Sequence, residues 1–431
     1  MKLAPRRRSL LAFGVAAPLF AAACGNKPGG SGSGGATAWA LTGGSEDAFR
    51  ESFEAWNSDH SDQEITAEYF ANDAYKEKIR TAVGSGNAPT LIFGWGGATL
   101  IDYVNNDYVE DLTDSTADLV GRLLPSVAAT GTVDGKIYAV PNNQSQPVLM
   151  YYNTEVLGSA NTDIPETWDD LLSAVDALKS DGVEAPIALA GQSVWPELMW
   201  ISYLAERVGG PEAFNRVVAG EAGAWTHPDM VRAAEMVTEL VDAGGFGDNF
   251  ASVVADAGAD QALVYTGKSG MILQGSWVYP DFITNAPDLV AAGGFAYGTF
   301  PLVDGGIGDP SNIVGNPANF WSVSSGDSEE AREAATAYLS EAVFNDEHID
   351  SLLSIGAVPP VADLEDRIAE TENADFLTLN YEMVRDAGNF QLSWDQAIPA
   401  DQAQELLDNL SQLFLGDISA DQFCEAMDAT L

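Results

Sequence analysis

The sequence predicts an α/β protein that is divided into two lobes. Segments with strand and helix patterns alternate along the chain, which is typical of a sheet that carries helices on its faces. The chain has 431 residues, and a protein of this length exceeds what one small hydrophobic core can hold. Its apolar fraction of 46% fits a globular protein.

The alternation begins with an apolar strand predicted at 36–41 and a helix at 46–57. In that helix Phe49, Phe53 and Trp56 recur at the spacing of one helical face. Further strands are predicted at 65–70, 90–93, 150–153 and 187–189, and further helices at 73–83, 100–104, 168–178, 196–208, 231–242, 331–342 and 403–415. No internal repeat is visible, which argues against a solenoid.

Residues 1–24 have the order of a secretory signal peptide. Three arginines at 6–8 precede an apolar run at 10–20, and three alanines at 21–23 precede Cys24. The apolar run is shorter than the roughly 20 residues that a membrane span needs. We therefore expect export across the cell membrane.

Cys24 resembles the lipidated cysteine of a lipobox, although Ala21 stands where that motif usually has leucine. The Gly/Ser-rich stretch 25–35 would then be a flexible tether that holds the protein at the outer face of the membrane. Residues 7–11 also resemble a twin-arginine export motif, so two export routes remain open. The alternative is an ordinary secretory signal with an incidental Cys24.

The chain is strongly acidic, with a formal net charge of −45 that becomes about −49 without residues 1–24. Such a surface repels nucleic acid and anionic lipid headgroups, so we expect no nucleic-acid partner and no membrane contact beyond the anchor. Only Cys24 and Cys424 are present, and Cys424 is expected to be buried. The three histidines are scattered, so we predict neither a metal site nor a cofactor.

Common enzyme motifs are missing, because the sequence has no GxSxG elbow, no HExxH and no Walker A loop. We therefore predict a binding protein without catalytic residues. With 64 acidic residues, a carboxylate pair for glycoside hydrolysis arises easily by chance. A secreted glycan-active hydrolase therefore remains an alternative.

Tryptophans give the positive functional signal. Four of them stand in turns beside small or polar residues, namely Trp95, Trp195, Trp277 and Trp394. An indole face covers the apolar face of a sugar, while nearby amides and carboxylates bind its hydroxyls. These four residues therefore predict a sugar pocket, and the alternative for each is a place in the core. A core position is predicted for Trp56, Trp168, Trp200 and Trp225.

Residues 142–146 (NNQSQ) form an uncharged polar loop directly before a predicted strand. Such a loop is either solvated or lines a cleft with amides that bind hydroxyls. The position beside the strand favours the cleft.

Several blocks of residues, in chain order, resemble the carbohydrate-binding branch of extracellular solute-binding proteins, the group of maltose-binding protein. They are GKIYAVP at 135–141, MYYN at 150–153, PETWDDL at 165–171, GKSGM at 267–271, QGSW at 274–277 and FLGDIS at 414–419. The resemblance spans residues 36–431 and implies a type II periplasmic-binding-protein fold. Members of this branch close their lobes on a solute and deliver it to the permease subunits of an ABC transporter.

The resemblance also implies domain boundaries, with crossings between the lobes near Pro147, Phe300 and Ser325. The N-terminal lobe would comprise 36–147 and 300–325, and the C-terminal lobe 148–299 and 326–431. A hinge at the crossings would close the cleft.

Carried onto this sequence, the resemblance implies a set of cleft residues from both lobes. They are Trp95 on the first lobe, Trp195, Trp277 and Trp394 on the second, Gln144 and Gln146 at the first crossing, Asn319 where the chain returns, and Ser45 and Glu46 after the first strand. The expected partners are a carbohydrate, with several tryptophans favouring an oligosaccharide, and the permease, on which a monomer docks.

A non-sugar solute such as an amino acid, iron or a polyamine is the remaining alternative. An amino acid needs an arginine for its carboxylate, and the aromatic loops contain none. A polyamine suits the acidic charge, but the loops hold more amides than acids.

Overall fold

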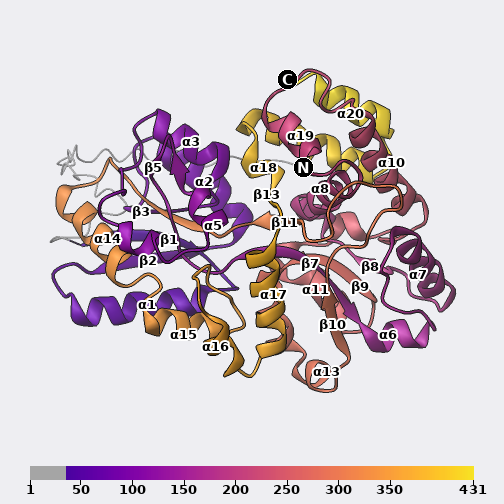
Figure 1. Cartoon of the computed structure of the whole chain (residues 1–431), viewed down its shortest axis with the longest axis horizontal. Helices are drawn as coiled ribbons and strands as arrows, with labels where there is room; N and C mark the ends of the chain where they lie inside the picture. Colours follow the sequence, from indigo (N-terminus) through magenta and orange to yellow (C-terminus); the bar gives the residue numbers. More distant parts are fainter. Residues whose placement is uncertain (1–34) are drawn as a thin grey trace, which may run out of the picture. The chain divides into compact units, whose positions relative to one another are not determined.

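In the computed structural model, residues 35–431 are described. The predicted signal, Cys24 and nearly all of the predicted tether lie outside the described residues. Two larger sheets, each with helices on its faces, make up most of the described part (Figure 1). We call the first sheet with its helices the first lobe, and the second sheet with its helices the second lobe.

The first sheet has the strand order β2-β1-β3-β12-β6. Its strands are β1 (Ala36–Leu41), β2 (Ile65–Phe70), β3 (Leu91–Gly94), β12 (Phe320–Val323) and β6 (Val140–Pro141). Along β1, residues Ala36, Ala38 and Ala40 are buried while the residues between them are partly exposed, because successive side chains of a strand point to opposite faces. The first three strands are parallel, as their alternation with helices predicts.

Helices α1 (Glu46–Asp59) and α2 (Asn72–Gly84) connect the parallel strands, and α3 (Gly97–Asn105) follows β3. In α1 the predicted face of Phe49, Phe53 and Trp56 is buried, and the rings of Phe49 and Phe53 lie 5.6 and 6.2 Å from that of Trp321 on β12. Each such ring contributes about 1.5–3 kcal/mol by burial. Because α1, α2 and α3 each follow a strand of this sheet, their N-terminal ends lie near the carboxyl ends of β1, β2 and β3.

The second sheet has the order β13-β11-β7-β9-β8, with β10 beside β7. Its strands are β7 (Gln146–Asn153), β8 (Ile187–Ala188), β9 (Met271–Gly275), β10 (Phe295–Gly298), β11 (Ile313–Asn316) and β13 (Phe390–Leu392). Every residue of β7 is buried. Val148 and Met150 face one hydrophobic core and Leu149 and Tyr151 face another, so this strand has a core on each side.

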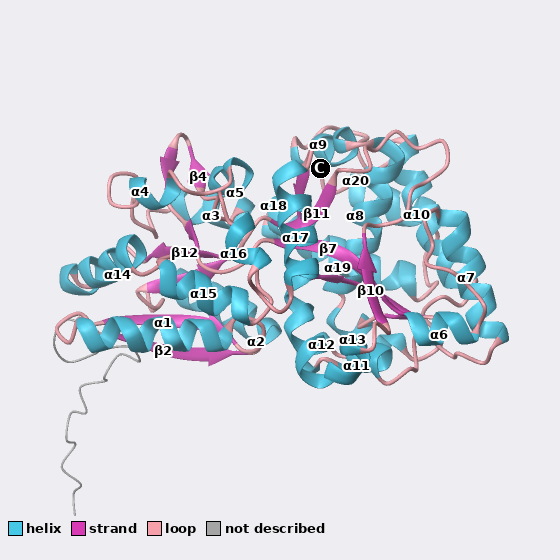
Figure 2. Cartoon of the chain, turned by 60° about the horizontal axis from the view of Figure 1, so that its bottom comes forward, coloured by secondary structure: helices cyan, strands magenta, loops and turns pink. Residues whose placement is uncertain are grey.

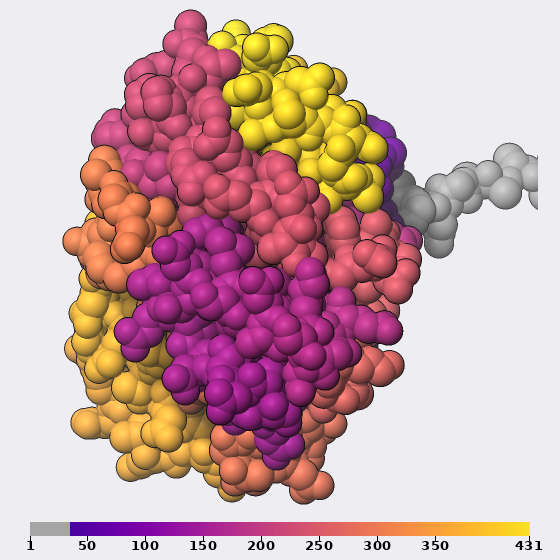
Figure 3. Space-filling view, turned by 90° about the vertical axis from the view of Figure 1, so that its right-hand side faces the viewer, coloured from indigo at the N-terminus to yellow at the C-terminus, as the bar shows by residue number. Residues whose placement is uncertain are grey.

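The predicted helices of the second lobe are present as α7 (Trp168–Ser180), α8 (Trp195–Gly209), α10 (Pro228–Asp242) and α19 (Ala400–Phe414). The core positions predicted for four tryptophans are confirmed, since Trp56, Trp168, Trp200 and Trp225 are at most 4% exposed. Cys424 on α20 (Ala420–Asp428) is buried as predicted. In Figure 3 the C-terminal helices (yellow) reach the outer surface of this lobe.

The remaining elements complete the described chain. They are α4 (Ala117–Val120), α5 (Pro125–Thr130), β4 (Thr132–Val133), β5 (Lys136–Ile137), α6 (Thr154–Ser159), η1 (Gly191–Ser193), α9 (Pro211–Val218), η2 (Phe250–Ser252), η3 (Ala255–Ala257), α11 (Ala259–Tyr265), η4 (Ser276–Val278), α12 (Tyr279–Asn285), α13 (Pro287–Ala291), α14 (Glu329–Glu341), α15 (Asp346–Ser354), α16 (Glu365–Ala369), α17 (Ala374–Asp386) and α18 (Trp394–Ala397). No helix within residues 35–431 combines the length and the apolar character that a membrane crossing requires.

The chain passes between the two sheets at 142–145 and at 317–319. These crossings run side by side, and the Asn142 N–H donates to the Asn319 carbonyl over 2.9 Å. The third passage lies between α15, which packs on α1, and β13 of the second sheet.

Two crossings differ from the sequence-based boundaries near residues 300 and 325. Strand β11 pairs with β7 and β13 in the second sheet, whereas α14 packs on β1 and α15 on α1 (Figure 2). A short strand or an amphipathic helix has the same local sequence pattern in either lobe. Which sheet it joins is decided by strand pairing and helix packing with distant residues, so the local pattern does not show it.

Candidate functional site

A cavity of about 220 Å³ lies between the lobes, beside the crossings. Its wall on the first lobe comes from the ends of β1 and β3 and the starts of α1 and α2, and its wall on the second lobe from α8, β9, η4 and α18. Carboxyl ends of parallel strands are the usual place for a ligand site in an open α/β sheet. The crossings contribute Asn143, Gln144 and Asn319, and further residues come from β7, β11, η3, α11 and α12.

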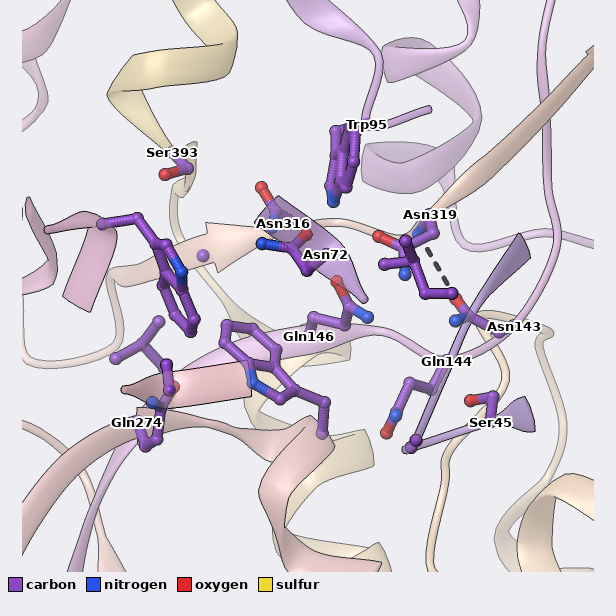
Figure 4. Close-up of a pocket in the computed structure, with 18 of the residues that line it drawn as sticks. Ser45, Asn72, Trp95, Asn143, Gln144, Gln146, Gln274, Asn316, Asn319 and Ser393 are labelled. Carbon is purple, nitrogen blue, oxygen red and sulfur yellow. Dashed lines mark hydrogen bonds between the residues drawn. The ribbon is translucent and has the colours of Figure 1, made fainter. Parts of the chain in front are cut away.

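Trp95 lines the cavity from the first lobe, directly after β3. Its ring packs edge-on against Phe93 and Tyr75, with centroids 5.5 and 6.0 Å apart. Gly96 and Gly97 follow with φ of 81° and 63°, a backbone region that favours glycine, so the GWGG segment turns sharply into α3. The indole is thereby held half-buried at the cavity, above the amides of Asn72 and Asn316 (Figure 4).

Trp195 and Trp277 line the cavity from the second lobe. Their ring centroids are 6.0 Å apart and their planes meet at 54°, so the two indoles form one angled aromatic surface. Trp195 opens α8 and Trp277 lies in η4, immediately after β9. The structure brings these three tryptophans together around one cavity. Trp95 and Trp277 stand at strand ends as predicted, whereas Trp195 is separated from β8 by η1.

The amide loop at 142–146 is buried, which excludes the solvated interpretation. Asn143, Gln144 and Gln146 line the cavity together with Asn319 of the second crossing. The Asn319 N–H donates to Asn143 Oδ1 over 3.3 Å, so this bond joins the two crossings (Figure 4).

Several polar atoms of the wall have no hydrogen-bond partner within the described chain. They are Ser45 Oγ, Gln144 Oε1, Trp195 Nε1, Asn316 Oδ1 and Asn319 Oδ1. Buried polar groups of native proteins are nearly always hydrogen-bonded, so unpaired ones around a cavity are free to bind a polar ligand. The set contains donors and acceptors, which matches hydroxyl groups that both donate and accept.

Two carboxylates of the wall, those of Asp395 and Asp256, are already engaged. Asp395 pairs with Lys76 at 3.3 Å, and Asp256 accepts the Asp73 N–H over 3.0 Å. Behind the wall, buried Asp260 accepts from Gln274 Nε2 over 2.9 Å. Burial raises the pKa of Asp260 to about 6, and the bond from Gln274 opposes this rise. The network fixes the amide of Gln274 at the floor of the cavity.

Trp394, which the sequence analysis assigned to the cleft, belongs to the core. It is 0% exposed, and its ring lies 5.1 and 5.8 Å from those of Trp225 and Phe214. Successive residues of a helix point about 100° apart, so the neighbours Ser393, Asp395 and Gln396 line the cavity while Trp394 turns away from it.

Glu46 is the second correction. Its carboxylate accepts from the Gly43 N–H over 3.1 Å and from Arg50 Nε over 2.9 Å, and it does not line the cavity. An acidic residue in the first turn of a helix with a base four residues later forms such a local pair. Ser45, its neighbour, does line the cavity.

The sequence analysis missed several residues of the wall. Asn72, Lys76, Gln261, Asn316 and Asp395 belong to this group. Asn72 begins α2 one residue after the end of β2, and the strand-end rule that singled out Trp95 applies to it as well. Lys76 and Gln261 lie inside helices, where nothing in the local pattern distinguishes them from solvated residues. Within residues 35–431, no group of three His, Cys, Asp or Glu side chains has a geometry that could hold a metal ion.

Comparisons with known proteins agree with this architecture. A family model for bacterial extracellular solute-binding protein matches residues 42–343. A probable sugar-binding periplasmic protein of Mesorhizobium japonicum is 28% identical over 251 residues, which are 56% of this chain and 57% of that protein. The chain spans only about half the length of the curated relatives that it matches, for example 54% of an ABC transporter extracellular-binding protein of Pyrococcus horikoshii.

Two solved structures cover almost the whole described chain. One, from work on xylan utilization by Caldanaerobius polysaccharolyticus, has a TM-score of 0.82 and 27% identity and covers 92% of this chain and 100% of that one. A chitin oligosaccharide binding protein has a TM-score of 0.81 and 22% identity, with 92% and 98% covered. These likenesses confirm the predicted two-lobed α/β fold.

Proposed function

Because the chain belongs to the family of bacterial extracellular solute-binding proteins, we propose that it binds a sugar in the cleft between its lobes. The observation that carries this proposal is the composition of one cavity, where three half-buried indoles meet five unpaired polar atoms. Indoles cover the C–H faces of a pyranose, and the polar atoms bind its hydroxyls. Of the cleft residues predicted from the sequence, seven are proposed to bind the ligand, namely Trp95, Gln144, Gln146, Trp195, Trp277, Asn319 and Ser45.

The charges of the wall favour an uncharged sugar over an acidic solute. Lys76 is the one cation among the residues that line the cavity, and Asp395 already pairs with it. A carboxylate ligand needs an unpaired arginine or lysine, so amino acids and uronic acids fit poorly. The angled pair of Trp195 and Trp277 opposite Trp95 provides more aromatic surface than one ring requires, which supports an oligosaccharide.

The names of similar proteins support the same class of ligand. The relative from Mesorhizobium japonicum is described as sugar-binding, and one solved neighbour as a chitin oligosaccharide binding protein. A third relative, from Bacillus subtilis, is described as melibiose/raffinose/stachyose-binding. These names motivate the panel of ligands below and leave the sugar open.

We extend the proposal to delivery and location. The exported protein would be held at the outer face of the cell membrane by a lipid on Cys24, and its closed monomer would dock on the permease subunits of an ABC transporter. The signal-like order of residues 1–24 supports export, and the two-lobed fold supports closure by a hinge. Intact-mass measurement of the membrane-extracted protein tests lipidation, and an unmodified N-terminus would contradict it.

A ligand screen tests the central proposal. Thermal melting is measured with raffinose, stachyose, xylo-oligosaccharides and chito-oligosaccharides, each beside its monosaccharide, and with galacturonic acid oligomers and amino acids as controls. A neutral sugar at 100 times its Kd should stabilise the protein by about 2.7 kcal/mol. Stabilisation by the amino acids or the uronic acids alone would contradict the proposal.

The proposed function includes no catalysis. The matching family and the solved neighbour described as a chitin oligosaccharide binding protein support a binder over the hydrolase alternative. Incubation of the protein with a fluorescently labelled form of the sugar that binds separates the two. A binder returns the sugar intact after many hours, and shortened products would assign a hydrolase.

A further inference from the structure

A carboxylate and an indole of the cavity wall stand one helical turn apart. Helix η4 runs directly into α12, and Trp277 and Asp281 lie four residues apart across this junction. Side chains at that spacing are neighbours on one helical face. Both residues line the cavity, so the face that they share is turned toward the ligand site.

The carboxylate of Asp281 has no positively charged partner within residues 35–431. Its partial burial raises its pKa, and a hydrogen bond from the Gln261 side chain opposes this rise. An amide donates a hydrogen bond but supplies no charge. Asp281 therefore differs from Asp395, whose charge Lys76 offsets over 3.3 Å.

A second carboxylate without a cation lies behind the first. Burial raises the pKa of Asp260 to about 6, and the charge of Asp281 adds to this rise. The donors to Asp260 are the side-chain amide of Gln274 and the backbone N–H of Gln261, each over 2.9 Å. Both donors are neutral. A positive charge beside these two carboxylates would relieve their mutual repulsion, and the effect is large where water is largely excluded.

The one lysine of the wall does not supply that charge. Lys76 Nζ lies 5.3 Å from the centroid of the Trp95 ring and pairs with Asp395. Gln274, which donates to Asp260, lies well apart from Trp95 in Figure 4. The cavity therefore has a neutralised ion pair on the Trp95 side and an uncompensated negative charge on the Gln274 side.

The indoles beside Asp281 add a second means of holding a cation. Trp195 and Trp277 form one angled aromatic surface, with ring centroids 6.0 Å apart. The face of an indole is negatively polarised, and a cation within about 6 Å of the ring centroid is attracted to it. Two indoles next to a carboxylate favour a substituted ammonium group, because both kinds of side chain attract it.

The unpaired amide oxygens of the wall suit the same ligand. Of the five unpaired atoms, three are the amide oxygens of Gln144, Asn316 and Asn319, which accept hydrogen bonds only. A ligand with more donors than acceptors satisfies them best. Sugar hydroxyls can donate to these oxygens, and an ammonium group brings three donors and no acceptor.

On the basis of the proposed sugar site, we propose that the ligand is an amino sugar, with its protonated amine between the Asp281 carboxylate and the indoles of Trp195 and Trp277. Amines of this kind carry a positive charge at neutral pH. Asp281 is then the residue that distinguishes the amine from a hydroxyl or an acetamide at the same carbon. Neutral sugars bind to the remaining wall less tightly, because they leave this charge uncompensated.

Calorimetric titration of the full chain with matched sugars tests the proposal. Glucosamine, galactosamine and β-1,4-linked glucosamine oligomers are each compared with the sugar that carries a hydroxyl or an acetamide in place of the amine. The amino form should bind about tenfold more tightly or better, the size expected from a charge-assisted hydrogen bond together with a cation–π contact. Added salt should reduce this preference, since it screens the charge.

Asp281→Asn keeps the shape of the side chain and removes its charge. In this variant the amino and hydroxyl forms should bind within about twofold of each other, because the amino form loses more affinity. Asp288→Asn is the control, since Asp288 is exposed on α13 and does not line the cavity. Its preference for the amino form should equal that of the wild type. Melting curves without sugar report whether each variant is folded.

Three results would overturn the proposal. The first is wild-type protein that binds the hydroxyl or acetamide form as tightly as the amino form, which would leave sugar binding itself intact. The second is an undiminished preference for the amino form in folded Asp281→Asn. The third is binding of choline or ethanolamine as tight as that of the amino sugars, which would assign the cavity to an amine without a sugar ring. If no sugar of any form binds, the proposed function fails and this inference fails with it.

Discussion

The indole of Trp277 covers the α-carbon of Gly275 so closely that a β-carbon at residue 275 would lie 1.9 Å from the indole Cζ3 atom. Gly275 has φ −73° and ψ 163°, an extended conformation open to any residue. The need for glycine at this position therefore comes from the indole and not from the backbone.

Gly275→Ala should displace the indole of Trp277 and lower sugar affinity by about tenfold or more, which corresponds to about 1.4 kcal/mol or more. The ring is half-buried and can move toward solvent, so the fold should persist. Calorimetric titration and the tryptophan emission maximum measure the two effects. Gly298→Ala is the control, because nothing lies within 4 Å of a β-carbon there, and equal behaviour of both variants would refute this prediction.

Trp277→Ala should weaken sugar binding by about 30-fold, because removal of an aromatic anchor from a binding site costs about 2 kcal/mol or more. Trp195→Ala should act in the same direction, since both rings belong to one surface. The effects of the two substitutions should not be additive, because the rings are in contact. Titration of the single and double variants checks this, and a Trp277→Ala protein with wild-type affinity and fluorescence response would exclude Trp277 from the site.

Substitution of Trp394 should affect stability and leave sugar affinity nearly unchanged. Trp394→Ala should lower the free energy of unfolding by about 3–5 kcal/mol, because the ring is fully buried. Trp394→Phe keeps an aromatic ring at this position, so it should lose less stability and retain sugar affinity within about twofold, a change of about 0.4 kcal/mol. Urea unfolding and titration measure the two quantities. A large affinity loss in Trp394→Phe at unchanged stability would return Trp394 to the cleft.

Glu197 should make stability depend on pH. Its side chain is 1% exposed, Oε2 has no hydrogen-bond partner in the described chain, and burial raises the pKa from 4.5 to about 8. The folded state therefore keeps a proton that the unfolded state releases, and the contribution of this group is complete below pH 4.5 and is lost as the pH rises to about 8.

Glu197→Gln should remove this dependence, because the amide carries no charge at any pH. The difference in unfolding free energy between Glu197→Gln and the wild type should therefore rise by a few kcal/mol from pH 5 to pH 8.5. Urea midpoints at both values measure the gain. Exposed Glu184 supplies the control Glu184→Gln, and an equal gain in that variant would contradict the assignment to Glu197.

Much of the fold could be predicted because its signals are local. The alternation in β1 and the face of Phe49, Phe53 and Trp56 in α1 specify their elements without reference to any distant residue. Three of the four proposed cleft tryptophans were identified for a related reason. Trp95 and Trp277 follow the carboxyl ends of β3 and β9, and Trp195 begins α8 in the segment after β8. The carboxyl ends of strands are where open α/β folds bind ligands.

The misassigned residues share a different cause. Trp394 stands among Ser393, Asp395 and Gln396, and the composition of this segment resembles that of a cleft loop. Which of these side chains faces the cavity depends on a helical rotation of about 100° per residue, which composition does not encode. The lobe of α14 likewise follows from its packing on β1, a contact across almost 300 residues.

By itself, the sequence determined the alternating elements, the amide loop at 142–146, and the tryptophans from which a cleft could be inferred, because these features depend on neighbours along the chain. Only the tertiary structure decided which tryptophans face the cavity and which sheet the late segments join. It alone paired Lys76 with Asp395, 319 residues apart in the sequence. Such a pair arises from the approach of two folded lobes, and no local pattern records which surfaces will meet.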